Sequence, residues 1–81
     1  MILPSKHLNT ERALIGIGGE VLQLLDQSKT VSRLWEEFRL TRSSEGKNEV
    51  GFDRFVLTLD MLFLFEAIEF DRGRIVRRGG K

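Results

Sequence analysis

Hydrophobic residues recur at the three- and four-residue spacing of an amphipathic helix in three stretches of the chain. The first stretch follows Asn9 and Thr10, either of which can cap a helix, and Ser32 is a good cap before the second. The expected helices lie within residues 9–66 and cover about Thr10–Asp26, Arg33–Thr41 and Phe52–Glu66. Each has one apolar face that must be buried against another element.

After the third helix, the period of the pattern changes from 3.6 to 2. Two short alternating runs flank a turn that contains Gly73, which predicts a β-hairpin over residues 68–77. Thr30 and Val31 are too few for an independent strand but can add one or two ladder bonds. The order helix, brief strand, helix, helix, hairpin is that of a winged helix-turn-helix. The expected fold is therefore a single, mostly α, α+β domain.

The remaining segments of the 81 residues are assigned by their polarity and by the proline. Pro4 favours an extended strip over residues 1–8, residues 42–51 are a polar loop, and residues 78–81 form a basic tail. No apolar stretch reaches the roughly 18 residues of a membrane span. Because the N-terminus also lacks the pattern of a signal peptide, we expect a cytoplasmic protein.

Composition limits how so short a chain is stabilised. There is no cysteine and only one histidine, so disulfides and a His/Cys zinc site assembled by this chain alone are excluded. Hydrophobic residues make up 41% and charged residues 31%, which is a globular composition. Burial against a partner is an attractive way to complete the small core.

The formal net charge of +1 conceals an uneven distribution. Residues 1–70 hold 8 basic and 11 acidic side chains, a balance of −3, whereas residues 71–81 have a balance of +4. A basic terminus can contact nucleic acid weakly or an acidic protein surface, or it can be a solvated tail. The basic side chains in question are Arg72, Arg74, Arg77, Arg78 and Lys81.

No group of residues predicts catalysis or a cofactor. The glycines of Gly16–Gly19 lie inside a helical pattern and lack the strand and Gly-Lys-Ser/Thr of a phosphate loop, so we expect a smooth face that another helix approaches closely. Glu36 and Glu37 are sequence neighbours and point about 100° apart on a helix. His7 has no nucleophile or carboxylate at a motif spacing, so it is expected to be an exposed or contact residue. We expect a protein that is not an enzyme and binds no cofactor or metal.

The third helix carries a second apolar stripe opposite the first. Its members are Leu57, Met61, Leu64, Phe65 and, beyond the helix, Ile68. A DNA-recognition helix would present base-reading side chains here, yet only Arg54 and Thr58 offer such contacts. In one interpretation the stripe is a protein interface; in the other, the hairpin folds over Leu64, Phe65 and Ile68 and leaves only Leu57 and Met61 exposed.

Three segments resemble the small middle-component proteins of bacterial three-component ABC-ATPase systems, which include Lamassu-type anti-phage and anti-plasmid systems. The segments are Ile2–His7, Thr30–Glu37 and Phe52–Glu69. The sequence departs from the pattern at Gly51, where a serine-like cap often precedes the Phe-Asp pair; glycine is itself an acceptable cap.

The resemblance implies a non-catalytic adaptor in a hetero-oligomer, docked on an SMC- or Rad50-like ABC ATPase and, as a second partner, on an effector that is often a nuclease. The proposed protein contacts are Ile2, Leu3, His7, Leu57, Met61, Leu64 and Phe65, with the basic tail as a further contact. The rival hypothesis is a DNA-binding regulator with the same fold, and a small antitoxin-like protein is a third.

Overall fold

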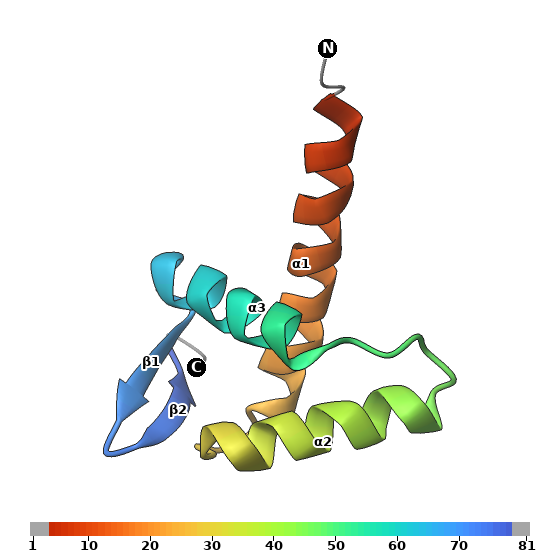
Figure 1. Cartoon of the computed structure of the whole chain (residues 1–81). Helices are drawn as coiled ribbons and strands as arrows, with labels where there is room; N and C mark the ends of the chain where they lie inside the picture. The colour runs from red at the N-terminus through yellow and green to blue at the C-terminus, as the bar shows by residue number, and fades with distance from the viewer. Residues whose placement is uncertain (1–3, 79–81) are drawn as a thin grey trace.

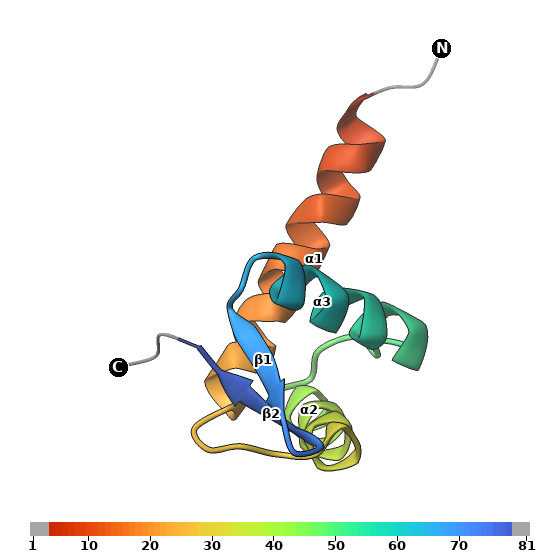
Figure 2. The same cartoon turned by 90° about the vertical axis from the view of Figure 1, so that its left-hand side faces the viewer.

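The computed structural model describes residues 4–78, and the side chains from Arg12 onward. The elements are α1 (Pro4–Leu24), α2 (Val31–Ser44), α3 (Phe52–Leu64), β1 (Ile68–Asp71) and β2 (Arg74–Arg77). Figures 1 and 2 show α3 crossing α1, with the hairpin following α3 and lying beside the start of α2. The described part of the chain is thus a mostly helical α+β fold, as predicted.

The start of α1 corrects the expectation for the N-terminus. The helix begins at Pro4, so the prediction of an extended strip over residues 1–8 is wrong for residues 4–8, and residues 1–3 lie outside the described residues. Proline is tolerated in the first helical turn, because the N–H that it lacks would have no intrahelical partner there. No helix breaker follows before Gly16, so the helix needs no new cap at Asn9 or Thr10.

Capping sets the bounds of α2. Thr30, and not the predicted Ser32, is the N-cap: its Oγ1 accepts a hydrogen bond from the Arg33 backbone N–H at 3.2 Å. The helix continues past Thr41 to Ser44, where Gly46 takes a φ of 70° and the Lys47 N–H bonds back to the Arg42 carbonyl. Glycine enters this left-handed region without the clash that a Cβ causes.

A similar reversal ends α3 two residues earlier than predicted. Glu66 takes a φ of 60°, and the Ala67 N–H bonds to the Leu62 carbonyl. The predicted hairpin over residues 68–77 is confirmed, with Ile68 opposite Arg77 and Asp71 opposite Arg74. Its two-residue turn places both central residues at positive φ, 55° at Arg72 and 79° at Gly73, as a tight hairpin requires.

A third backbone segment pairs with the hairpin, one residue before the predicted position. Lys29, and not Thr30 or Val31, forms an antiparallel bridge with Ile75. The two residues exchange both backbone hydrogen bonds, at 3.1 and 2.7 Å. The hairpin is thereby fixed to the connection between α1 and α2.

One core joins the three helices and the hairpin. Its buried apolar members are Ile17, Val21, Leu25, Leu34, Phe38, Phe55, Leu59, Leu62, Ile68 and Ile75. Trp35 packs on Phe38 and Phe55 with ring centroids 6.2 and 5.0 Å apart. The aromatic packing ties α2 to the first turn of α3.

The predicted close approach at the glycines of α1 occurs at Gly18 alone. A Cβ added there would lie 3.1 Å from Met61 Cε and 3.3 Å from Leu62 Cδ2, whereas one added at Gly16 or Gly19 would meet nothing within 4 Å. Gly18 therefore lets α3 pack directly on the backbone of α1.

This contrast predicts opposite effects of substitution along one helix. Gly18→Val should lower the free energy of unfolding by about 1–3 kcal/mol, because the branched side chain forces α1 and α3 apart. Gly16→Ala and Gly19→Ala should each raise it by about 0.5–1 kcal/mol, since alanine is the better helix former and has room. Urea unfolding measures all three, and equal stability of Gly18→Val and the wild type would contradict the packing.

Candidate functional site

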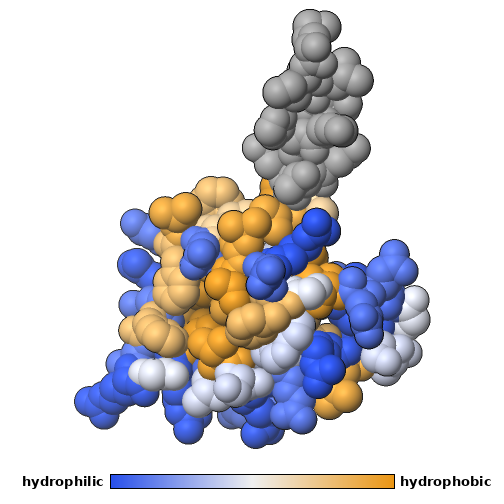
Figure 3. Space-filling model, in the orientation of Figure 1, coloured by the Kyte–Doolittle hydropathy of each residue, from blue (hydrophilic) through white to orange (hydrophobic). Residues whose placement is uncertain are grey.

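An exposed apolar surface covers α3. Leu57 is 51%, Leu64 82% and Phe65 69% exposed, a high fraction for large hydrophobic side chains that lie within two helical turns of one another. Figure 3 shows a hydrophobic region over α3 on the face that Figure 1 presents. Exposed apolar side chains grouped in this way are typical of protein interaction sites. We call these three residues, together with Met61, the α3 patch.

The structure shows how far the hairpin covers the second stripe. The hairpin does not cover Leu64 and Phe65, so that alternative is wrong for them; it buries Ile68, which is 2% exposed. The hairpin packs instead beside Phe63, whose ring meets that of Phe70 edge-on at 6.0 Å. The stripe is therefore open along most of its length.

Met61 differs from the exposed position expected for it. It is half-buried and packs against the core, with its methyl group over Gly18. The absence of a side chain at Gly18 creates the space that Met61 fills. Met61 is thus the inner edge of the α3 patch rather than its centre.

Ile15 adds an exposed residue that the sequence analysis missed. Its side chain is 59% exposed on α1, one turn before Gly18, on which Met61 packs. It lies outside the apolar face of α1, because the buried positions are Ile17 and Val21. The sequence could have identified Ile15, because it is a large apolar residue outside the apolar face of its helix.

The outermost line of α3 carries carboxylates as well as leucines. Four exposed residues spaced four, three and four positions apart lie along one line of the helix: Asp53, Leu57, Asp60 and Leu64. Thr58, expected as a base or phosphate contact, is instead fully buried, and its hydroxyl donates to the Arg54 carbonyl at 2.8 Å. This line offers no hydrogen-bond donor side chain to DNA; Arg54, the other expected contact, is exposed on α3 beside the line.

The basic residues of the hairpin are dispersed rather than gathered on one face. Arg77 is on the core-facing side of the hairpin, where its Nη1 donates to the Leu22 carbonyl at 3.4 Å. Arg74 is directly opposite Asp71 on the other side, and Arg78 Nη1 lies 3.7 Å from Glu66. Arg72 occupies the turn. Their positive charge is therefore partly offset by nearby carboxylates.

Three predicted contact residues fall outside the described residues: Ile2, Leu3 and Lys81. His7 lies in α1 by its backbone, and its side chain is not among those described.

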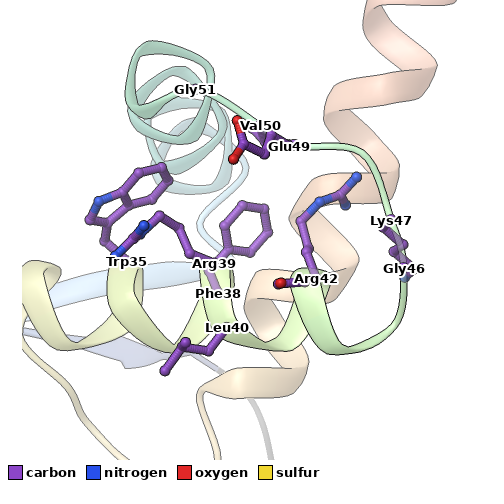
Figure 4. Close-up of a pocket in the computed structure, with 11 residues that line it drawn as sticks. Trp35, Phe38, Arg39, Leu40, Arg42, Gly46, Lys47, Glu49, Val50 and Gly51 are labelled. Atoms are coloured by element: carbon purple, nitrogen blue, oxygen red, sulfur yellow. The ribbon is translucent and has the colours of Figure 1, made fainter.

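A cleft of about 500 Å³ opens between α2 and the connection to α3. Figure 4 shows the side chain of Arg39 over the ring of Trp35, with Phe38 between α2 and α3. The Arg39 guanidinium lies 5.7 Å from the Trp35 ring centroid, a cation–π distance. Arg42 is held by two hydrogen bonds to Glu20, at 2.8 and 2.9 Å, and one to the Asn48 carbonyl. The charge of Arg42 is thus balanced by Glu20, and the cleft contains no group of side chains that identifies a ligand.

Lys29 is a buried cation at the centre of an ionic network whose other members reach the surface. It is 7% exposed, and its Nζ donates to the Leu24 carbonyl and, at 2.6 Å, to Glu37 Oε1, with Asp26 Oδ1 3.1 Å away. Arg33 Nε donates to the other Glu37 oxygen at 2.7 Å. Hydrogen bonding by Lys29, and then by Arg33, lowers the pKa of Glu37 below its ordinary value of 4.5. The hydrogen bond to Glu37 also raises the pKa of Lys29.

The lowered pKa predicts a stability that depends on pH. A carboxylate whose pKa is lower in the folded than in the unfolded state stabilises the fold above about pH 4.5, and this contribution is lost as the pH falls through the folded-state pKa. We therefore expect Glu37→Gln to be less stable than the wild type at pH 7, with the difference shrinking below pH 4.5. Thermal melts from pH 7 to pH 3 test this, and a constant difference would contradict it.

The structure reveals no arrangement that binds a metal among the residues it describes, since no group of three or more His, Cys, Asp or Glu side chains converges there. Within residues 4–78, no helix is long and apolar enough to cross a membrane.

Comparison with known proteins identifies one family. Residues 3–78 match the sequence model described as ABC-three component (ABC-3C) system Middle Component 6, which is nearly the whole chain. No curated protein and no solved structure matches.

Proposed function

We propose that this chain, which belongs to the Middle Component 6 family of ABC-three component systems, is a non-catalytic adaptor that docks on an SMC- or Rad50-like ATPase of its system. A middle component of a three-component system has partner components. The effector, often a nuclease in systems of this kind, is the second partner of the proposed adaptor. The proposed setting is bacterial anti-phage or anti-plasmid defence of the Lamassu type.

The observation that carries the proposal is the α3 patch. Leu57, Leu64 and Phe65 are exposed together on one helix, and Leu64 and Phe65 are the two most exposed of the large hydrophobic side chains described. Burying a large apolar side chain contributes about 1.5–3 kcal/mol, so three of them can provide the central contacts of an interface. A partner protein is the natural means of burial.

The proposed fold type is a winged helix. Support comes from the element order and from the bridge between Lys29 and Ile75, which places a short third segment beside the hairpin. In a DNA-binding winged helix, α3 would be the recognition helix. Here its outer line presents Asp53 and Asp60, which repel phosphates, so the same helix suits a protein partner better.

Co-expression with the ATPase encoded in the same operon tests the proposal. We expect the two proteins to co-elute in size-exclusion chromatography, and the complex to persist at high salt because its central contacts are apolar. Separate elution of two folded proteins at all concentrations would overturn the proposal.

DNA binding separates the adaptor from the rival regulator. The isolated protein should bind random duplexes weakly and without a preferred site, with log K falling by a slope of about −0.9 in log salt for each phosphate contacted. Changing Arg74, Arg77 and Arg78 to Glu should remove this binding uniformly across sequences and leave the ATPase complex largely intact. Fluorescence anisotropy at several salt concentrations measures both. Discrimination of one operator by about 10³ or more would favour the regulator.

A further inference from the structure

We infer that the α3 patch receives a helical segment of the partner in which apolar side chains are flanked by lysines or arginines. This inference rests on the proposed function, because it specifies the chemistry of the partner at the same surface. It follows from the outer line of α3, where carboxylates alternate with leucines.

Asp53 and Asp60 are the charged members of this line. Within the described part of the chain, neither has a basic nitrogen within 4 Å. Glu20 and Glu37 are paired with Arg42 and Lys29, but exposed carboxylates on other elements, such as Glu36 and Glu69, also lack an ion pair among the described residues. What distinguishes Asp53 and Asp60 is their position on the same line of α3 as the exposed leucines. Asp53 lies in the first turn of α3, where the helix dipole favours an acid. Asp60 has no such role, so its charge remains available to a partner.

The spacing of the line indicates the shape of the segment that fits it. From residue 53 to residue 64 the line is about 16 Å long, at 1.5 Å per residue. Leu57 and Leu64 are two turns apart, with Phe65 and the half-buried Met61 along one side. A partner helix with apolar residues at three- and four-residue spacing matches these positions, and basic residues beside them would face the two carboxylates.

Charge also disfavours two other occupants. A second copy of this chain would bring the same two carboxylates to the interface and no basic side chain from this line, so it adds like charge where opposite charge is favourable. Nucleic acid carries the same sign of charge as the line and offers little to the leucines. A basic, apolar helix satisfies both kinds of side chain.

Charge variants of the full chain test the inference with the operon's ATPase. Asp60→Lys combined with Asp53→Asn should weaken the complex about tenfold or more in low salt, chiefly through slower association, and about 0.5 M salt should reduce the difference. Glu36→Lys, an exposed change on α2 that equals the charge change of Asp60→Lys alone, is the control and should have little effect. Circular dichroism melts confirm that each variant is folded. An unchanged affinity in the folded double variant would overturn the inference.

Two synthetic amphipathic helices, identical in their apolar positions but flanked by lysine or by glutamate, provide a readout that does not need the ATPase. The lysine peptide should bind the full chain about tenfold more tightly, which corresponds to about 1.4 kcal/mol. Equal binding, preference for the glutamate peptide, or self-association of the chain at α3 would overturn the inference. If the ATPase fails to bind but the lysine peptide is preferred, the ATPase is not the partner, while the inferred chemistry of the segment that binds the α3 patch still holds. If the ATPase binds with an affinity that neither Asp60→Lys nor salt changes, the proposed function is supported and the inference about the basic segment fails.

Discussion

Replacing Leu57 and Leu64 together by glutamine is expected to weaken the proposed complex with the ATPase by about 100-fold or more while leaving the domain folded. Both side chains lie on the outer line of α3 and are more than half exposed, so they contribute little to the core. Glutamine is a good helix former and adds no charge. A loss of affinity in this double variant would therefore measure the contribution of the apolar contacts, because the carboxylates Asp53 and Asp60 are unchanged.

A matched control for this double variant is available on α2. Leu40 is 61% exposed and lies outside the α3 patch, and Figure 4 shows it directed away from Trp35. Leu40→Gln should leave the affinity within about threefold of the wild type. Surface plasmon resonance measures the affinities, and thermal melts should agree closely for all variants. Full binding by the folded double variant would remove the α3 patch from the interface.

Met61 is unsuitable for this test, although its position in the sequence suggested otherwise. Its methyl group packs over Gly18, so a polar group there would disturb the contact between α1 and α3. A loss of binding by a Met61 variant would not distinguish an interface from a destabilised fold. Leu64 provides the distinction, because it is 82% exposed.

Replacing Lys29 by methionine is expected to lower the free energy of unfolding by about 2 kcal/mol, since hydrogen bonds to charged groups contribute about 1.5–3 kcal/mol. Methionine retains an apolar stem but cannot donate to the Leu24 carbonyl or to Glu37, both of which lose a donor in a partly buried environment. At about 4–8 °C per kcal/mol for a domain of this size, the melting temperature should fall by about 10 °C.

Arg33→Met is the control for Lys29→Met, because Arg33 donates to the same carboxylate from an exposed position. Its effect should be clearly smaller, since solvent screens exposed pairs. Hydrogen exchange of the hairpin adds a second measurement: in Lys29→Met the amide of Ile75, which bonds to the Lys29 carbonyl, should exchange faster. Equal melting temperatures for Lys29→Met and the wild type would show that the network does not stabilise the fold.

The sequence predicted the elements whose signals are local. Hydrophobic spacing located three helices and their buried faces, and the alternating runs around Gly73 located the hairpin over residues 68–77. The bounds were less accurate, since a cap depends on which hydroxyl reaches the backbone: Thr30 does so where Ser32 was expected. The candidate site could also be predicted from local spacing. An apolar stripe opposite the core stripe is visible in the sequence, and Leu57, Leu64 and Phe65 are exposed as an interface requires.

By itself, then, the sequence determined a small, mostly helical domain with surplus apolar surface on its third helix, because helical periodicity depends only on neighbouring residues. Tertiary structure alone decided which residues of that stripe face solvent. Gly18 admits Met61 to the interior, and the hairpin, held by Lys29 at Ile75, turns towards Phe63 and leaves Phe65 open. These outcomes depend on contacts between residues that are far apart in the chain. Side-chain packing and hydrogen bonds between different elements decide them, and the spacing of residues within one element does not predict them.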